Sequence, residues 1–356
     1  MFFVFFVTKE SIFYKFSHLF PCKIHRNTNG LSILINLPPN CTVDRNDKKR
    51  YNKNIITSIE RMHKMLLSTP FGSSMKCLGW KKAIDALSAA GFEALDFSFY
   101  MTKYLHANPL SKDDFLNIRA YAAEKGLVFN QAHAPFPTSD ADPVKNQQCF
   151  EEVVKSIREA SYLGVPIIVV HPMQHLTYLG EGNPERLFEM NMEFYNALKP
   201  YCEEYNVKIA LENMWQHRGK KIMHSVCSRP EEFNRYLDSL DREWFVGCLD
   251  VGHAFLVCED VDGFIEKMGT DRLKALHVHD VDGIVDSHTL PYYGNVEWDR
   301  VMKALAKIGY TGDFTFEADG FFAGNPDELL PSALRHMAET GKYLMRKIEA
   351  YQKEYR

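Results

Sequence analysis

Histidine and aspartate side chains are concentrated in the segment ALHVHDVDGIVDSHTLP, residues 275–291. Its three histidines and three aspartates accompany an apolar lead-in that predicts a buried strand. The chain would therefore carry several ionisable groups out of the core at one point. Imidazoles and carboxylates grouped in this way bind divalent metals or exchange protons with a substrate. The alternatives for what these groups meet at the end of the strand are a metal, a nucleic acid or only solvent.

Ionisable residues also follow the other apolar runs of the chain, at intervals of 29 to 41 positions, about one strand plus one helix. They are His133, His171, Glu212, Asp250 with His253, His279 and Glu317. The carboxyl ends of parallel strands meet on one face of a barrel, so these side chains are expected to line one cup. A lone buried histidine is more often a packed core residue than a ligand. Six strand ends in register indicate at least one metal.

The ligand types narrow the choice of metal. Glu212, Asp250 and Glu317 offer oxygen and His279 offers nitrogen, a set that suits Mn²⁺, Co²⁺, Mg²⁺ or Zn²⁺ and leaves positions open for a substrate. Strand side chains alternate between faces, so His277 is expected to point the same way as His279 but one layer deeper. His277 is therefore predicted to be packed or to support a ligand. Further metals or substrate contacts are predicted at His133, His171, His253 and His288.

The elements that position these residues alternate regularly. Eight apolar runs lie at 65–69, 93–97, 127–132, 166–170, 207–211, 245–249, 273–278 and 313–317. Segments with helical periodicity separate them, and several end at glycine, as helices commonly do. These glycines are Gly91, Gly126, Gly164 and Gly309. Alternating strands and helices predict an α/β fold, and eight units in about 290 residues predict a (β/α)₈ TIM barrel. A doubly wound open sheet is the alternative, but no G-x-G-x-x-G follows the first strand.

The composition excludes several classes of protein. With 356 residues, a formal charge of −4 and a pI near 6.4, the chain has no overall attraction to nucleic acid or anionic lipid. Its eight cysteines form no C-x-x-C pair and indicate reduced thiols of a cytoplasmic protein. No apolar run approaches the ~20 residues of a membrane span. A homo-oligomer is compatible with the sequence.

The first 61 residues differ from the rest. MFFVFFV lacks the basic flank and cleavage site of a signal peptide, and the text from Lys9 to Lys64 is polar and aperiodic. A targeting segment, a small accessory element and a start codon placed too far upstream are the alternatives, and the last is favoured because MHKMLLSTPFG resembles a natural start. Residues 1–61 are thus predicted to be a poorly structured extension or a misassigned start, and residues 62–356 to be the barrel.

The chain from about Met65 onward resembles the xylose isomerase-like TIM barrel superfamily. The motifs that carry the resemblance are AHAP, HP, LEN, LDVGHA, HVHDVDG with DSH, GNVEWDRVMKALAKIGYTG and FEADG. The resemblance implies that Glu212, Asp250, His279 and Glu317 bind a catalytic divalent metal. The superfamily also includes the endonuclease-IV-type apurinic endonucleases. Their three-zinc site matches this chain at a further set of positions, His133, His171, His253, Asp286 and His288.

Two enzyme functions follow from the resemblance. A sugar isomerase or epimerase, acting on a sugar, sugar phosphate or inositol-type substrate, would transfer a proton through Glu212 or Glu317 while the metal stabilises an enediolate. A zinc phosphodiesterase would cleave abasic DNA. The loops APFPTSD and NMWQHRGKK lack the corresponding endonuclease sequences, which favours the isomerase or epimerase. A metal-binding module without catalysis is a third class, which would have little use for so many potential ligands at an open mouth.

Substrate contacts are predicted around the mouth of the barrel. His253, Trp215 and Arg218 are the candidates for binding the sugar, and Arg218 lies in HRGKK, whose cations suit a phosphate or carboxylate. A solvated loop is the simpler interpretation of those charges. An aromatic rim of Phe136, Trp215, Tyr292, Tyr293 and Phe321 would suit a sugar ring, a base or plain packing. Where sugar enzymes commonly have Pro-Gly-x-Gly, this chain has LPYYGNVEW, which leaves the sugar unidentified.

Overall fold

The computed structural model describes residues 4–7, 22–27, 30–35, 64–101, 109–258 and 260–355. It divides into two units, Met1–His63 and Lys64–Arg356. In the first unit, β1 (Val4–Val7), β2 (Cys22–Asn27) and β3 (Gly30–Ile35) form an antiparallel sheet in the order β1-β3-β2. These strands are not among the predicted ones. The predictions of a disordered segment or a misplaced start concern residues that lie largely outside the described ranges.

Eight parallel strands form one sheet within residues 64–101, 109–258 and 260–355, in the order β12-β11-β8-β7-β6-β5-β4-β13. They are β4 (Leu67–Pro70), β5 (Ala94–Ser98), β6 (Val128–His133), β7 (Ile167–Val170), β8 (Lys208–Glu212), β11 (Phe245–Asp250), β12 (Leu273–His277) and β13 (Phe314–Thr315). A parallel bridge between Val278 and Phe316 joins the two end strands, and the Val278 N–H donates to the Thr315 carbonyl. The predicted (β/α)₈ barrel and its eight strands are confirmed.

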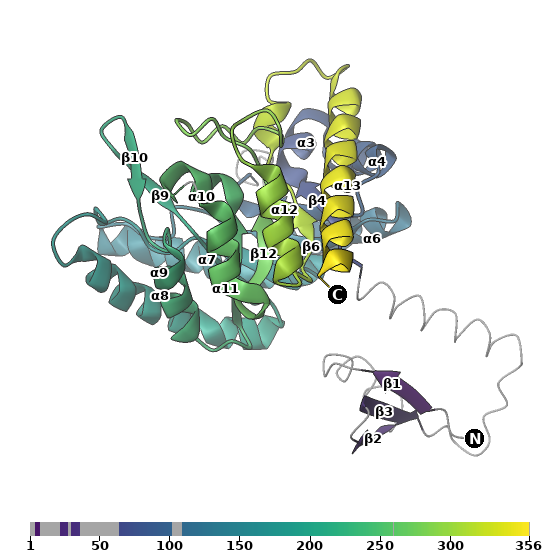
Figure 1. The fold of residues 1–356 in the computed structure, drawn as a ribbon, viewed down its shortest axis with the longest axis horizontal. Coiled ribbons are helices and arrows are strands. Elements are labelled where there is room, and N and C mark those ends of the chain that lie inside the picture. The colour runs from purple at the N-terminus through teal and green to yellow at the C-terminus, as the bar shows by residue number, and fades with distance from the viewer. Residues whose placement is uncertain are drawn as a thin grey trace, which may run out of the picture. The chain divides into compact units, whose positions relative to one another are not determined.

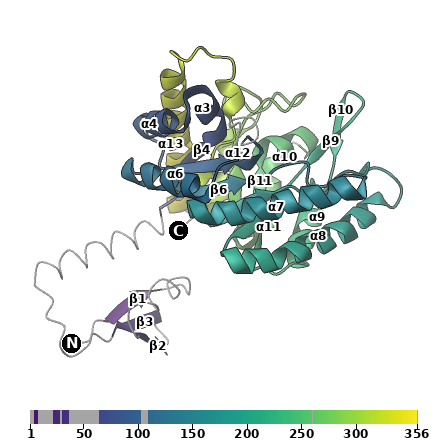
Figure 2. The same ribbon diagram turned by 180° about the vertical axis from the view of Figure 1, so that it is seen from behind.

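Helices follow the strands and surround the barrel (Figures 1 and 2). They are α3 (Phe71–Leu78), α4 (Trp80–Ala90), α6 (Lys112–Glu124), α7 (Pro143–Leu163), α8 (Asn183–Tyr205), α9 (Pro230–Asp238), α10 (Val251–Cys258), α11 (Val261–Arg272), α12 (Trp298–Lys307), η2 (Asp319–Phe321) and α13 (Leu330–Glu354). Gly91 and Gly164 adopt left-handed conformations that end α4 and α7, as predicted. None of the helices described is long and apolar enough to cross a membrane.

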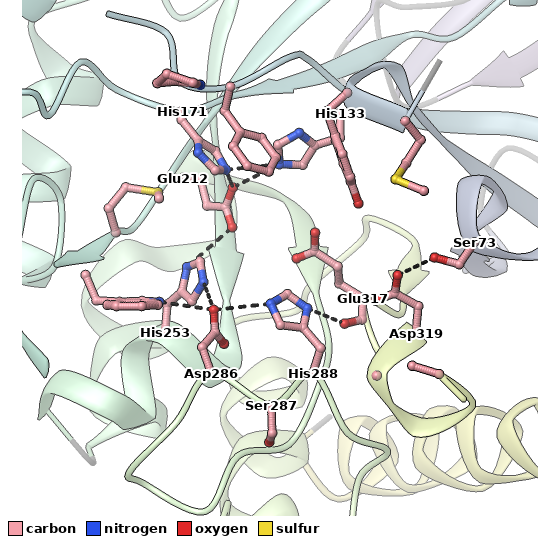
Figure 3. A pocket seen from close by; sticks show the side chains of 18 of the residues that line it. Ser73, His133, His171, Glu212, His253, Asp286, Ser287, His288, Glu317 and Asp319 are labelled. Carbon is pink, nitrogen blue, oxygen red and sulfur yellow. Dashed lines mark hydrogen bonds and ion pairs between the residues drawn. The ribbon is translucent and has the colours of Figure 1, made fainter. Parts of the chain in front are cut away.

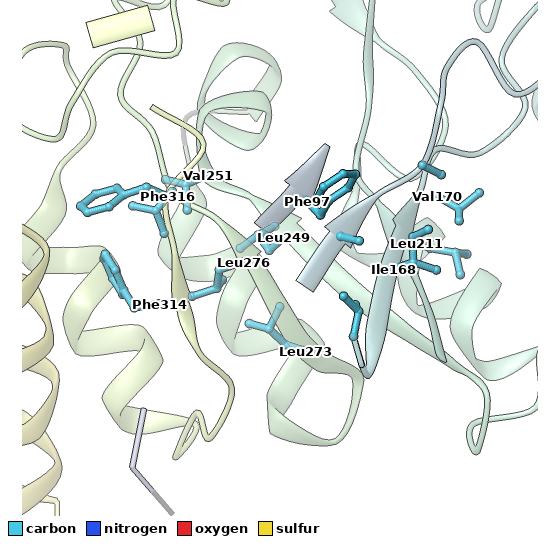
Figure 4. Packing of buried hydrophobic residues seen from close by; sticks show 14 of the residues in the cluster. Phe97, Ile168, Val170, Leu211, Leu249, Val251, Leu273, Leu276, Phe314 and Phe316 are labelled. Carbon is cyan, nitrogen blue, oxygen red and sulfur yellow. The ribbon is translucent and has the colours of Figure 1, made fainter. Parts of the chain in front are cut away.

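Alternation along the strands separates two sets of side chains. Leu211, Leu249 and Leu276 face outward and belong to the main apolar cluster, which Figure 4 shows beside the surrounding helices. Their neighbours Ala210, Cys248 and Ala275 form a small cluster inside the barrel together with Val169 and Val246. The next residues on that inner side are His171, Glu212, Asp250 and His277. The strand pattern therefore fills the barrel with small apolar groups and ends its inner rows with ionisable ones.

An antiparallel hairpin that the sequence did not predict extends the loop after β8. It consists of β9 (Trp215–Arg218) and β10 (Lys221–His224), with Gly219 in a left-handed conformation at the turn. Figure 1 shows the hairpin projecting beyond the helices. Its polar sequence, WQHRGKKIMH, lacks the apolar alternation that identifies a buried strand, which is why the loop was expected instead.

Candidate metal centre

The carboxyl ends of the strands open into a cavity of about 1100 Å³. Seven of the predicted ionisable residues line it: His133, His171, Glu212, His253, Asp286, His288 and Glu317. They come from the ends of six different strands or from the segments that follow them, including α10 for His253, and Figure 3 shows them pointing toward one another. This is the face on which barrel enzymes build their active sites.

The inner cluster, defined as Glu212, Asp250, His277 and Glu317, lies at the base of the cavity. One ligand atom from each residue lies within 4.8 Å of the others. His277 Nδ1 is 3.0 Å from Glu212 Oε1, 3.0 Å from Glu317 Oε2 and 3.9 Å from Asp250 Oδ2. Three carboxylates so close to one another repel unless a proton or a cation lies among them.

The imidazole of the inner cluster belongs to His277, whereas the sequence led us to expect His279. β12 ends at His277, one residue before the predicted end, and His277 pairs in register with Asp250. His279 lies beyond the strand and contacts both oxygens of Asp250 through Nε2, at 2.9 and 3.0 Å. Its ring occupies space left by Gly252, where a Cβ would lie 2.6 Å from His279 Nδ1. The structure thus places His277 among the carboxylates and His279 beside one of them.

A histidine pair borders the inner cluster on the β6 and β7 side. His133 Nε2 and His171 Nε2 are 3.0 Å apart, and they lie 3.6 and 3.0 Å from Glu212 Oε2. His133 Nδ1 donates to the carbonyl of Ala134 at 2.8 Å, so its Nε2 carries a lone pair when the ring is neutral. Both imidazoles therefore direct a ring nitrogen at the Glu212 carboxylate.

The outer cluster is defined as His253, His279, Asp286 and His288. In Figure 3 its members His253, Asp286 and His288 lie across the cavity from the histidine pair. Nδ1 of His253 donates to the carbonyl of Asn213 at 3.0 Å, and Nδ1 of His288 donates to that of Glu317 at 2.8 Å. A carbonyl only accepts, so Nε2 of each neutral ring carries a lone pair.

Both of these Nε2 atoms lie 3.2 Å from the same atom, Asp286 Oδ2. Two lone pairs and a carboxylate oxygen therefore converge on one point. The rings of His279 and His288 are also stacked, with centroids 4.1 Å apart, so charging both would place like charges face to face. A cation bound between the lone pairs would stabilise this arrangement better than additional protons on the imidazoles.

The pKa shifts of these residues also indicate that the site needs positive charge. Burial disfavours the charged form of His253, but Asp250 and Asp286 outweigh it and raise its pKa to about 10. Burial also opposes ionisation of Glu212, yet His277 and His171 hold its pKa well below the usual range. For Glu317, burial is likewise outweighed by His277, and the pKa lies below the usual range. Ionised carboxylates are thus retained only because cationic groups surround them.

Both clusters fit a divalent cation by their chemistry. The inner one offers three carboxylates and an imidazole, which suits Mn²⁺, Co²⁺, Mg²⁺ or Zn²⁺, and the outer one, with three imidazoles and one carboxylate, suits Zn²⁺ better than Mg²⁺. Buried polar atoms support this. Asp286 Oδ1 and His279 Nδ1 are buried without a hydrogen-bond partner among the described residues.

The predicted substrate contacts are only partly brought to the cavity. Trp215 lines it and donates from Nε1 to Asp286 Oδ2 at 3.2 Å. Phe136 also lines it and stacks on His171. Arg218 is exposed on the β9–β10 hairpin and is not among the lining residues. Tyr292, Tyr293 and Phe321 do not line the cavity either.

Sequence reasoning missed lining residues from the first two strands. Tyr100 follows β5 by two positions, and its ring packs against His133 and Phe136 with centroids 5.4 and 4.9 Å away. Ser73 follows β4 in α3 and donates to Asp319 across the cavity. The strand-end rule would have found Tyr100, but only imidazoles and carboxylates were considered at strand ends.

Comparison with known proteins adds a family and several relatives. Residues 84–340 match the family model described as xylose isomerase-like TIM barrel. The uncharacterised protein y4fM of Sinorhizobium fredii is 30% identical over 268 residues, which cover 67% of this chain and 81% of that protein. The D-psicose 3-epimerase of Enterocloster bolteae is 24% identical, covering 67% and 76%. A probable endonuclease 4 of Bacillus licheniformis is 30% identical, covering 54% and 67%.

Solved structures share the architecture. A D-tagatose 3-epimerase-like protein superposes with a TM-score of 0.63 at 20% identity, covering 82% of this chain and 99% of the other. The IolI protein with a bound zinc atom superposes with a TM-score of 0.62 at 16% identity, covering 82% and 99%. At these sequence identities the likeness shows a shared fold alone.

Proposed function

Since this chain belongs to the xylose isomerase-like TIM barrel family, we propose that it is a divalent-metal-dependent isomerase or epimerase of a small sugar or polyol. One observation carries the proposal. Glu212 and Glu317 come from β8 and β13, which are three strands apart in the barrel, and each places a carboxylate oxygen 3.0 Å from His277 Nδ1. Two ionised carboxylates thus face one point from different sides. The sugar-epimerase names among the relatives and structural neighbours support the same class.

The two carboxylates would act on the hydrogen next to the substrate carbonyl. Their pKa values lie below the usual range, so both are ionised at neutral pH and able to accept a proton. For epimerisation, one of them removes the proton from one face of the carbon and the other returns a proton to the opposite face. A 1,2-isomerisation would need only one of them.

A metal would be held by Glu212, Asp250, His277 and Glu317. When bound, it would supply Lewis-acid polarisation of the substrate carbonyl. The remaining lining residues bind and orient the sugar. Trp215 presents a ring held by its hydrogen bond to Asp286, and Phe136 presents a second ring, which stacks on His171. Stacking between such rings and the apolar face of a sugar would align the reacting carbon with Glu212 and Glu317.

Solvent exchange tests this proposal directly. Purified protein with a known metal content is incubated with free ketoses, ketose phosphates and keto-inositols in D₂O, and deuterium at the carbon next to the carbonyl is measured. We expect exchange in at least one of these substrates, lowered by about 10²–10⁴-fold in Glu212→Gln and Glu317→Gln at equal metal occupancy.

The matched control is Glu159→Gln, which changes a half-buried glutamate on α7, outside the cavity, and should leave exchange unchanged. His253→Ala should lower exchange more mildly, because it loosens the outer cluster or the substrate without removing a base. Full exchange by both metal-loaded Gln variants would rule out proton transfer by these carboxylates.

The ligand geometry also favours a second candidate, a zinc phosphodiesterase acting on abasic DNA. Besides the outer cluster, the described residues offer a third group of ligand atoms, His133, Glu212 and His277, which shares Glu212 and His277 with the inner cluster, so there is room for more than one ion. One relative is a probable endonuclease 4. We expect one tightly held ion and weaker binding of others. Three dialysis-resistant zinc ions per chain, together with cleavage of an abasic-site oligonucleotide, would favour the phosphodiesterase instead.

A further inference from the structure

A fourth buried carboxylate, Asp96, lies beneath the inner cluster. It belongs to β5, is only 3% exposed and is not among the residues that line the cavity. Its Oδ2 is 3.7 Å from His277 Nε2, on the side of the ring opposite to Glu212 and Glu317. Asp96 Oδ1 and His277 Nε2 are both buried and have no hydrogen-bond partner among the described residues.

The position of Asp96 is built into the sheet. The pairing of β5 with β6 shifts register between Leu95 and Asp96, so that Asp96 pairs with Gln131. Gln131, itself 3% exposed, donates from Nε2 to Asp96 Oδ2 at 2.9 Å. A glutamine amide thus holds a carboxylate in the interior of the barrel. An ionised group is destabilising there unless it interacts with a further partner.

That partner is identified by the protonation of His277. Nδ1 faces the carboxylates of Glu212 and Glu317, so it is the nitrogen available to a cation. An imidazole that binds a cation through Nδ1 carries its proton on Nε2. A buried N–H without an acceptor is destabilising, because it loses its hydrogen bond to water and gains none in the protein. The Cys248 thiol also faces the ring, but it is a weak acceptor, whereas Asp96 is a carboxylate.

We propose that Asp96 is a positioning residue that accepts the Nε2 proton of His277 and thereby fixes the tautomer in which Nδ1 binds the metal. This inference rests on the proposed metal centre. Carboxylates that hold a metal-ligating histidine in this way typically account for about 10–100-fold in metal affinity. Asp96 would act through His277 alone, without contact to the substrate.

The variant that tests the proposal is Asp96→Asn, which keeps the shape and the bond from Gln131 but removes the negative charge. Zn²⁺ dissociation constants are measured by competition with a chelating dye, on the full-length protein. We expect the constant to rise about 10–100-fold in Asp96→Asn. The matched control is Asp313→Asn. Asp313 is a half-buried aspartate that likewise accepts a hydrogen bond from an amide, that of Asn130, but it precedes β13 at the opposite end of the barrel.

A second measurement reports the tautomer of His277 directly. Nitrogen-15 NMR of the histidines in the Zn²⁺-loaded wild-type protein reports which ring nitrogen of His277 carries the proton. We expect protonated Nε2, with a hydrogen-bonded proton resonance far downfield that disappears in Asp96→Asn.

The outcomes separate the two levels of inference. Wild-type protein that binds no Zn²⁺ would overturn the metal centre itself. Wild-type protein that binds Zn²⁺ while His277 is protonated at Nδ1 would overturn the role of Asp96 and leave the centre intact. The role of Asp96 would also be overturned if Asp96→Asn folded and kept the wild-type Zn²⁺ dissociation constant, or if Asp313→Asn lost as much Zn²⁺ affinity as Asp96→Asn.

Discussion

Gly252 offers a sharp test of how the site is packed. It lies in α10, two residues after Asp250, and its φ is not in the left-handed region, so alanine is acceptable to the backbone. An added Cβ would overlap His279 Cε1 and lie 2.6 and 2.7 Å from its two ring nitrogens. The ring cannot retreat, because His288 stacks on it and Asp250 bonds it through both oxygens.

The expected cost of Gly252→Ala follows from these contacts. Forcing an extra methyl into a packed interior costs about 1–3 kcal/mol, and losing a hydrogen bond to a charged group costs roughly 1.5–3 kcal/mol. The greater helix propensity of alanine returns about 1 kcal/mol. The net loss of unfolding free energy is about 1.5–5 kcal/mol, which lowers the Tm of a domain of this size by roughly 3–10 °C.

The assay is urea unfolding in the presence of a chelator, so that metal binding does not contribute to the free energy. Gly263→Ala is the matched control, because Gly263 is also helical without a left-handed φ. Its Cβ would meet the carboxylate of Asp260, the exposed N-cap residue of α11, which accepts from the Gly263 N–H at 3.4 Å and can turn toward solvent. The control should lose at most about 1 kcal/mol, the value of that cap. Equal stability of the two variants, with His279 unmoved in Gly252→Ala, would refute the packing argument.

Four further predictions concern other parts of the molecule. Burial raises the pKa of Glu232 to about 7, so between pH 4.5 and 7 the folded protein keeps a proton that the unfolded chain has lost, and stability falls as pH rises. Between pH 5 and 8 the unfolding free energy of Glu232→Gln, measured by urea titration, should therefore rise by about 2–3 kcal/mol relative to that of the wild type. Parallel pH profiles of the two proteins would contradict this. Asp280 accepts hydrogen bonds from the Tyr292 and Val296 N–H groups and from Trp298 Nε1. Asp280→Asn should therefore lower the unfolding free energy by about 2–4 kcal/mol, as thermal unfolding would show. It should also weaken Zn²⁺ binding by the loop that carries the outer cluster, as a binding titration would show. Adding metal to the apo protein at 1,000 times its dissociation constant should stabilise it by about 4 kcal/mol, and a Tm independent of metal concentration would exclude a site in the folded state. A chain that begins at Met62 should keep the Tm and metal content of the full chain, whereas insoluble or metal-free protein would place the first 61 residues in the domain.

The sequence by itself determined the barrel and the set of residues at its mouth. The features that predicted the barrel are local: apolar runs of strand length, helical periodicity between them and glycines at helix ends. Each of these features depends only on the residues of its own segment. Because all parallel strands of a barrel point the same way, the residues after each run were bound to share one face. His133, His171, Glu212 and Glu317 could therefore be grouped before their distances were known.

Only the tertiary structure decided which of those side chains meet. The choice between His277 and His279, which lie two residues apart, depends on the residue at which β12 ends and on its register with β11. The approach of Asp96 to His277 depends on a register shift between β5 and β6, which no local pattern encodes. Tautomers such as that of His253 are set by carbonyls 40 residues away. Strand ends are local in the sequence, but pairing, register and proton positions arise from contacts between distant segments, and these decide the chemistry of the site.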